Sequence, residues 1–167
     1  MIGTTGRSVA ESRSSVVRLM VPTDANFTGN VFGGTILNEI DRVAYVVAMR
    51  HSRAHTCVTA SFDQVDFIAP VHVGDLVEVT GEISGVGRTA MEVFVTVMAA
   101  GIRGEPRRLV MQGHVTMAAL DSDGRPTPVP TVEPASEEER RNLEAGAARM
   151  AARRAAHQRR QSVSGGS

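Results

Sequence analysis

The sequence contains no lysine, and all 18 of its basic residues are arginine. Catalysis through a lysine Schiff base is therefore excluded. The single cysteine, Cys57, excludes an internal disulfide and is typical of a reducing compartment. No apolar run approaches the roughly 20 residues that a membrane-spanning helix needs. No G-x-S-x-G motif occurs, so the sequence does not favour a serine hydrolase.

The composition is that of a globular chain of one domain. The 167 residues are 42% hydrophobic and 22% charged, with a net charge of zero. A neutral molecule has no overall electrostatic attraction to nucleic acid or to an anionic membrane, and neither partner is expected. The first residues lack the apolar core of a signal peptide, which favours a cytoplasmic location.

A long helix is predicted from Gly33 to Arg50, because its apolar residues recur at intervals of three and four. These residues are Ile36, Leu37, Ile40, Val43, Ala44, Val47 and Ala48. Apolar and small residues outnumber charges so strongly that protein should surround this helix on most sides.

The rest of the core alternates between apolar and polar residues, as strands do. The predicted strands are Ser15–Met20, Thr56–Phe67, Asp75–Ser84, Arg88–Ala100 and Leu109–Leu120. Short connections at 85–87 and 101–106 contain glycine and predict hairpins, so these strands should be antiparallel. One antiparallel sheet curled around one apolar helix buries both apolar surfaces. The predicted class is α+β, with the hotdog arrangement.

Three regions are expected along the chain. Residues 1–13 are polar and predict a flexible N-terminus, and residues 14–130 form the hotdog domain. Residues 131–167 are expected to hold a proline-rich linker, a charged helical tail and a disordered end. Ser136 and Glu139 have the spacing of a capping box at the start of the tail helix. The apolar stripe of that helix is thin, which predicts a frayed helix on the surface.

Asp41 is a carboxylate on a helix face of small and apolar residues, where it costs free energy unless another group pairs with it. One interpretation is structural, with a hydrogen bond to Tyr45 or a position at the one wet edge of the helix. The other is catalytic, because desolvation raises the pKa of a carboxyl group toward the range of a general base. Periodicity alone leaves both open.

Two neighbouring features could act on a carbonyl group. Gly33 and Gly34 open the helix, where backbone N–H groups lack helical partners and could stabilise an oxyanion. They could equally form a plain tight turn. Asn26 lies in the preceding loop and could hold a water or a carbonyl, although asparagine is also a common turn residue.

The run VPTDANFTGNVFGGTILNEIDRVA resembles the signature of the cytosolic acyl-CoA hydrolase family of hotdog thioesterases. The similarity continues through HSR at 51–53, VTASFDQVDFIAPVHVGD at 58–75, GVGRTAMEV at 85–93 and LDSDGRPTPVP at 120–130. It covers roughly residues 15–130. Phe32 stands where the mammalian members carry histidine, as it does in bacterial members, and this difference concerns pocket shape more than chemistry.

The resemblance implies hydrolysis of acyl-CoA to a free fatty acid and CoA without a metal or other cofactor. It implies that Asn26 and Asp41 act at the thioester from facing protomers of a dimer, with Gly33 and Gly34 at the oxyanion. Asp41 would be a general base or a nucleophile, which the sequence does not separate. Members of the family commonly assemble further, as trimers of dimers.

Candidates for contact with CoA or the acyl chain are less specific. Gly87, Arg88 and Thr89 could bind phosphate, or could be an ordinary hairpin. Thr59 is a further candidate. The candidate pocket walls are Phe32, Phe62, Phe67 and Met91.

Two other functions remain open at the level of the sequence. One is a hotdog module that binds acyl-CoA without turnover. The other is an enoyl-CoA hydratase, although the aspartate–histidine motif of those enzymes has no counterpart here. His51 and His55 have the spacing of metal ligands, but no third ligand is evident and no metal site is expected.

Overall fold

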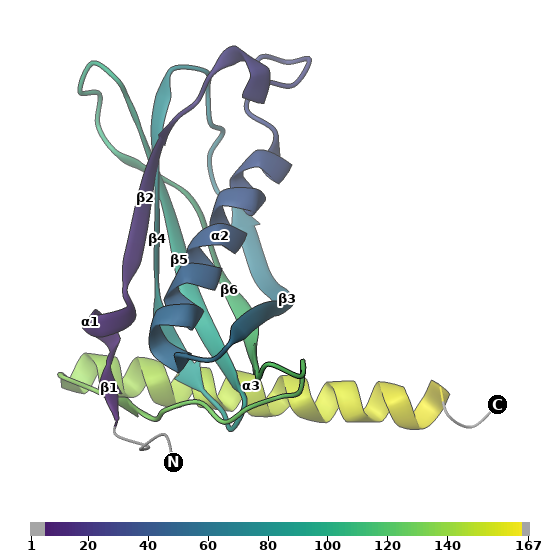
Figure 1. The fold of residues 1–167 in the computed structure, drawn as a ribbon. Coiled ribbons are helices and arrows are strands. Elements are labelled where there is room, and N and C mark those ends of the chain that lie inside the picture. The colour runs from purple at the N-terminus through teal and green to yellow at the C-terminus, as the bar shows by residue number, and fades with distance from the viewer. Residues whose placement is uncertain (1–5, 165–167) are drawn as a thin grey trace.

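The computed structural model describes residues 6–164 of the chain, and the side chains of residues 6–159. One long helix, α2 (Gly33–Ser52), lies along one face of a five-stranded sheet (Figure 1). The strands are β2 (Ser14–Leu19), β3 (Thr56–Phe67), β4 (Asp75–Val86), β5 (Ala90–Gly101) and β6 (Arg108–Leu120). Their order is β2-β4-β5-β6-β3, and every neighbouring pair is antiparallel. The predicted α+β hotdog fold is confirmed.

The core lies between α2 and the central strands. Alternate residues of β5, from Met91 to Val97, are fully buried, and so are Ala44 and Ala48 of the helix. The helix approaches the sheet closely at Gly81, where an added Cβ would lie 2.9 Å from Cγ1 of Val43. The small residues that predicted a wrapped helix thus let α2 lie directly against the strands.

The end of α2 lies two residues beyond the predicted Arg50. Arg53 follows the helix in the left-handed conformation, with φ of 51°, and its N–H donates to Met49 O. His51 is fully buried, and its Nε2 lies 3.1 Å from Pro130 O. Burial lowers the pKa of His51, so the imidazole acts as part of the core.

The N-terminal residues differ from the flexible segment that the sequence predicts. Strand β1 (Arg7–Ser8) pairs in parallel with β7 (Val132–Glu133), and the short helix α1 (Val9–Ser12) follows β1. The Val9 side chain is buried. This pairing joins the two ends of the domain, a contact that local sequence does not reveal. Residues 1–5 and 165–167, within the predicted flexible start and disordered end, lie outside the described residues.

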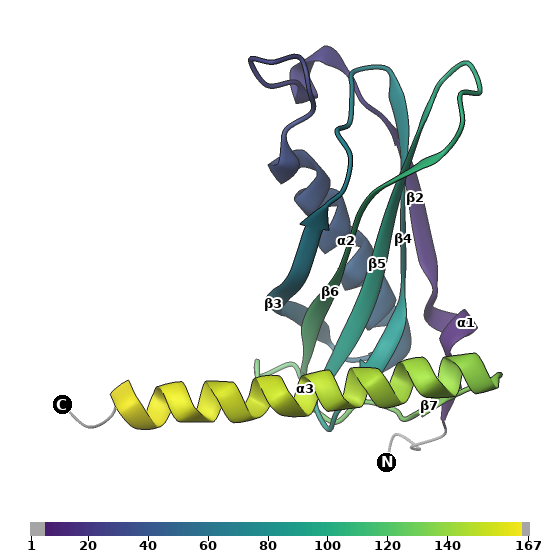
Figure 2. The ribbon, with the colours of Figure 1, turned by 180° about the vertical axis from the view of Figure 1, so that it is seen from behind.

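The predicted tail helix is α3 (Glu137–Ser164), and it crosses the face of the sheet opposite α2 (Figure 2). One half of the predicted capping box forms, because Glu139 N donates to Ser136 Oγ at 3.1 Å. The Glu139 carboxylate accepts its bond at 2.8 Å from Ala135 N, one residue before the position that a capping box uses. The helix is docked along part of its length, because Gly146 packs against the backbone of Ser84. None of the helices in residues 6–164 is long and apolar enough to cross a membrane.

Candidate active site

Asp41 lies midway along α2, on the side that faces β3. The hydroxyl of Thr59 donates to Asp41 Oδ1 at 2.5 Å, and the same hydroxyl lies 3.5 Å from Met117 Sδ. Neither structural interpretation from the sequence describes this contact, because the partner of the carboxylate comes from another element. The contact joins two of the predicted site residues.

Asn26 lies in the loop that follows a 3-10 turn, η1 (Pro22–Asp24). Its side-chain oxygen accepts hydrogen bonds from the Thr28 N–H at 2.9 Å, the Thr28 hydroxyl at 2.7 Å and the Asn30 N–H at 3.2 Å. Asn26 is therefore a turn residue, as one interpretation held. Its Nδ2 group makes no hydrogen bond within the described part of the chain, so the amide still has a free donor.

The N-terminus of α2 has no side-chain cap among the described residues, because the capping position is occupied by Phe32. The two glycines have different roles there. A Cβ on Gly33 would lie 3.0 Å from Cζ of Phe67, so a side chain at this position would require the ring to shift slightly. A Cβ on Gly34 would meet no atom within 4 Å, which leaves open space beside that part of the helix.

A cavity of about 310 Å³ adjoins this helix end. Its lining includes Val31, Gly33, Ile36, Phe67, Pro70 and Val110. Of the predicted pocket walls, Phe67 lines this cavity. Met91 is fully buried in the core. Phe32 lies at the same helix end and Phe62 lies on β3, and both are exposed without lining the cavity.

Within one chain the predicted catalytic residues form two separate groups. Gly34 and Asp41 are seven residues apart on α2, which corresponds to about 10 Å along the helix axis. The loop of Asn26 precedes the helix and lies at its N-terminal end (Figure 1). A thioester carbonyl that touches the N-terminus of α2 is therefore too far from Asp41 of the same chain.

The predicted CoA contacts are also divided. Gly87, Arg88 and Thr89 form the β4–β5 hairpin, and Arg88 is exposed while its carbonyl accepts a hydrogen bond from Val129 N at 3.0 Å. Thr59 of β3 lies elsewhere on the sheet, where it pairs with Met117 of the neighbouring strand β6.

Phe67 lies far from these residues, because its partner on β6 is Met111, six residues away from Met117. Six residues of strand span about 20 Å. Phe67 therefore belongs to the group at the N-terminus of α2, and Thr59 belongs to the group around Asp41.

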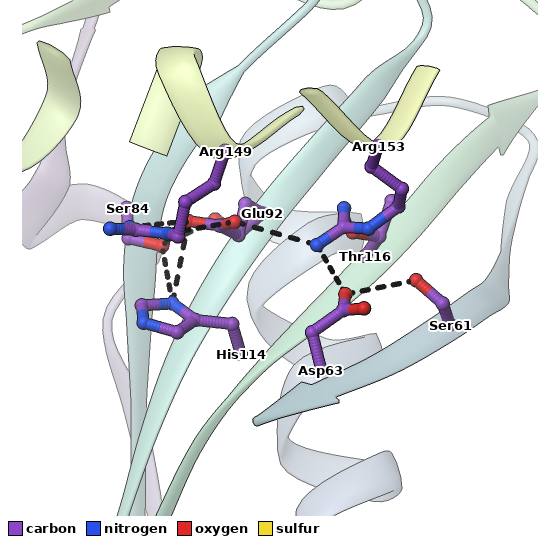
Figure 3. A network of polar contacts seen from close by, with 8 residues as sticks. All are labelled: Ser61, Asp63, Ser84, Glu92, His114, Thr116, Arg149 and Arg153. Atoms are coloured by element: carbon purple, nitrogen blue, oxygen red, sulfur yellow. Dashed lines mark hydrogen bonds and ion pairs between the residues drawn. The ribbon is translucent and has the colours of Figure 1, made fainter. Parts of the chain in front are cut away.

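A buried carboxylate that no sequence motif indicated lies on the face of the sheet opposite α2 (Figure 3). Glu92 of β5 is fully buried and accepts hydrogen bonds from Arg149 Nη2 at 2.6 Å and Ser84 Oγ at 2.9 Å, while His114 Nδ1 lies 3.3 Å away. Burial raises the pKa of Glu92, but the bonds from His114, Arg149 and Ser84 outweigh it and lower the pKa to about 2. The alternation of β5 places Glu92 on this face, but only the position of α3 buries it.

Ser84, His114 and Glu92 do not form a catalytic triad. Ser84 Oγ lies 3.5 Å from His114 Nδ1, and Glu92 approaches the same nitrogen. In a triad the serine and the carboxylate occupy different ring nitrogens, so that the proton can pass between them. Ser84 is also buried. The cluster is therefore structural, in agreement with the absence of a G-x-S-x-G motif.

Known proteins match this chain in sequence. The model of the Thioesterase superfamily matches residues 28–105. An uncharacterised acyl-CoA thioester hydrolase of Bacillus subtilis is 40% identical over 133 residues, which are 80% of this chain and 77% of that protein. The cytosolic acyl coenzyme A thioester hydrolase of Homo sapiens is 32% identical, over 90% of this chain and 40% of that protein.

Solved structures match it as well. The acyl-CoA hydrolase from Bacillus cereus has a TM-score of 0.86 and 38% identity, covering 96% of this chain and 97% of that one. An apo-hexameric acyl-CoA thioesterase has a TM-score of 0.82 and 40% identity, covering 93% and 97%. The Staphylococcus aureus acyl-CoA hydrolase in complex with butyryl coenzyme A and coenzyme A has a TM-score of 0.85 and 32% identity, covering 96% and 98%.

A sheet wrapped around α2 and these matches define a hotdog-fold thioesterase. Within that class the chain belongs to the acyl-CoA hydrolase family, as the resemblance of residues 15–130 implied. The predicted family and the predicted enzyme class, a thioester hydrolase, are confirmed.

Proposed function

We propose that this protein hydrolyses acyl-CoA to a free carboxylic acid and CoA, at a site that two copies of the chain complete. The observation that carries the proposal is the hydrogen bond from Thr59 to Asp41 Oδ1 at 2.5 Å. It orients a carboxylate on the flank of the central helix of a thioesterase fold. Among the similar solved structures are three variants of the Staphylococcus aureus hydrolase, in which an asparagine, a threonine or an aspartate is changed to alanine. Asn26, Thr59 and Asp41 are residues of these same three types.

Asp41 acts in this proposal as a general base. Because Thr59 occupies Oδ1, the other carboxylate oxygen is available to a water. The water oxygen attacks the thioester carbon while its proton passes to Asp41. The carbon–sulfur bond then breaks, and the CoA thiolate leaves and takes a proton to become the thiol. The reaction needs only water and side chains of this protein.

The oxyanion is assigned to the N-terminal end of α2. Backbone N–H groups at Gly33 and Gly34 lack a side-chain cap among the described residues, and such groups favour developing negative charge. The free Nδ2 of Asn26, in the loop at the same end of the helix, is the proposed further donor. The cavity lined by Phe67 is the proposed place for the acyl chain.

The distance between these two groups supports a dimer. About 10 Å along α2 separates Gly34 from Asp41, so a second copy must bring its own Asp41 to the first copy's helix end. Strand β3 is an edge of the sheet, and Val58 and Phe62 on it are 44% and 39% exposed. An unpaired edge with exposed apolar residues is suited to pairing with another chain. Further assembly into a trimer of dimers is the proposed state, in line with the hexameric relative.

Arg88 and its hairpin neighbours Gly87 and Thr89 are the proposed contacts for the phosphates of CoA. The Arg88 side chain is exposed, and its guanidinium can form paired hydrogen bonds with phosphate oxygens. The cytoplasm is the proposed compartment, which is consistent with the free thiol of Cys57.

The test is release of free thiol from acyl-CoAs of different chain length. Asp41→Asn should lower kcat by about 10²–10⁴-fold, because it removes the base. Asn26→Ala should lower kcat by about 10²–10³-fold, because it removes an oxyanion donor. Glu144→Gln is the matched control, since it changes an exposed carboxylate on α3, across the sheet from Asp41, and should leave the rate unchanged.

Other outcomes separate the rival functions. Full activity of Asp41→Asn would contradict the assignment of the base. Binding of CoA without thiol release at high enzyme concentration would instead indicate a binding module. A change in the absorbance of an enoyl-CoA, with no thiol released, would indicate a hydratase.

A further inference from the structure

Arg18 of β2 joins the loop that carries Asn26 to the helix that carries Asp41. One terminal nitrogen of its guanidinium donates to Asp24 Oδ1 at 2.7 Å, and the other donates to Glu39 Oε1 at 2.9 Å. Asp24 precedes Asn26 by two residues, and Glu39 precedes Asp41 by two residues. A single side chain therefore connects the segments that hold the two proposed catalytic residues.

Both carboxylates are withdrawn from solvent, while the arginine lies at their edge. The side chains of Asp24 and Glu39 are 8% and 5% exposed, and that of Arg18 is 36% exposed. Two buried carboxylates that share one cation would repel each other if the cation were removed. The position of the loop relative to the helix therefore depends on the charge of Arg18.

Asp24 transmits this restraint to the loop. Its second oxygen accepts a hydrogen bond from Val21 N at 2.9 Å, and its carbonyl accepts one from Phe32 N at 3.0 Å. Asn26 N donates to Asn30 O at 2.7 Å, which closes the loop between Asp24 and Phe32. The turn around Asn26 is thus held at its base.

Glu39 connects Arg18 to the helix, on the face of α2 opposite Asp41. Residues two apart on an α-helix point in nearly opposite directions, so Glu39 faces β2 while Asp41 faces Thr59 on β3. Arg18 does not touch Asp41. It acts on the orientation of α2 and on the loop.

We propose that Arg18 is a positioning residue, which sets the loop of Asn26 against the N-terminal end of α2 through the paired carboxylates Asp24 and Glu39. This inference rests on the proposed function, in which the amide of Asn26 acts on the thioester carbonyl. Displacement of a catalytic group by about 1 Å can cost as much as 10²-fold in rate. Lysine cannot replace Arg18 fully, because a single ammonium lacks the fork that reaches two acceptors at once.

The experiment compares Arg18→Ala and Arg18→Lys with Arg42→Ala. Arg42 is the matched control because it also binds Glu39, at 3.3 Å, but its side chain is 67% exposed and makes no contact with Asp24. Thiol release is measured under conditions where thermal unfolding shows each variant to be folded. Arg18→Ala should lower kcat by roughly 10- to 100-fold with little change in KM. The kcat of Arg18→Lys should lie between those of Arg18→Ala and the wild type. The kcat of Arg42→Ala should stay within about twofold of the wild-type value.

A double-mutant cycle separates positioning from general stability. If Arg18 acts through Asn26, adding Arg18→Ala to the Asn26→Ala variant should lower kcat by less than a further factor of about three. An unchanged kcat in Arg18→Ala, or a full and independent loss in the double variant, would overturn the inference about Arg18 alone. Full activity of Asn26→Ala would overturn the catalytic assignment of the loop, and the role of Arg18 with it. If Arg18→Ala does not fold, the same cycle is carried out with Arg18→Lys.

Discussion

The charged carboxylate of Glu92 is shielded from solvent. The carboxylate is fully buried beneath α3, and Arg149 and Arg153 approach it from that helix (Figure 3). Its pKa of about 2 lies below the ordinary value of 4.5 in the unfolded chain, so folding favours the ionised form. This difference corresponds to stability on the order of 3 kcal/mol.

The sign of this shift makes a prediction for acid unfolding. The contribution of Glu92 is present above pH 4.5 and is lost progressively as pH falls toward 2, because the unfolded chain binds the proton more readily. Glu92→Gln should lower the unfolding free energy at pH 7 by about 2 kcal/mol, less than for a fully buried pair because Arg149 is partly exposed.

Thermal unfolding from pH 7 to pH 3 measures this effect. Glu92→Gln should lose less stability than the wild type between pH 5 and pH 3. The control is Glu144→Gln, an exposed carboxylate on α3, the helix that covers Glu92, and it should follow the wild-type curve. Equal loss of stability with falling pH in the wild type and in Glu92→Gln would refute the stabilising role of ionised Glu92.

At the scale of elements, α3 is held to the sheet by close packing as well as by charge. Gly146 is buried, and a Cβ there would collide with the carbonyl of Ser84 and lie 3.0 Å from Cα of Gly85. The atoms that would have to move are backbone atoms of β4. The contact therefore requires glycine for its size, although glycine is a weak helix former.

Substitution at this point should reverse the usual effect of helix propensity. Alanine stabilises an exposed helix position by about 1 kcal/mol relative to glycine. Gly146→Ala should nevertheless lower the melting temperature, because the added methyl group displaces α3 from β4.

Ala148→Gly, at an exposed position of the same helix, measures the propensity effect alone and should cost about 1 kcal/mol. Chemical or thermal unfolding gives both values. A rise in melting temperature for Gly146→Ala would show that α3 does not pack against the sheet as described.

At the scale of the whole molecule, the proposed site requires a second chain. The two edges of the sheet offer a comparison, because both carry exposed apolar residues: Phe62 on β3 is 39% exposed and Val17 on β2 is 59% exposed. Only the β3 edge lies beside the Asp41–Thr59 pair. Pairing of two chains along β3 would complete the site.

Phe62→Glu should therefore dissociate the dimer and lower activity together, because an unpaired charge in an interface core is costly. Val17→Glu places the same charge on the opposite edge and should preserve the dimer. Light scattering after gel filtration gives the mass of each variant, and thiol release gives its activity. A monomeric and fully active Phe62→Glu variant would refute the shared site.

The helix and strands were predictable because their information is local. The strand Thr56–Phe67 was predicted with both of its ends correct, and α2 was predicted with its first residue correct. Alternation and helical spacing depend on neighbours in sequence, and a hotdog fold buries one face of each element. The second role of Asn26, as a turn residue, was also visible from its type.

Three contacts were not predictable, because each joins residues far apart in the chain. Thr59 binds Asp41 across 18 positions, Arg18 reaches Glu39 across 21, and Arg149 covers Glu92 across 57. The sequence shows each of these residues as one more polar group on an amphipathic element. Nothing local indicates which cation will pair with which carboxylate.

The loop and helix from Asp24 to Arg50 show where this division lies. The sequence by itself determined the buried helix, the glycines at its start and the family, since spacing and residue type suffice for these. Only the tertiary structure decided that Gly33 lies under Phe67, that Arg18 connects loop and helix, and that Glu92 is buried beneath α3. Burial and pairing of charges depend on which elements meet, and that is settled only when the whole chain packs.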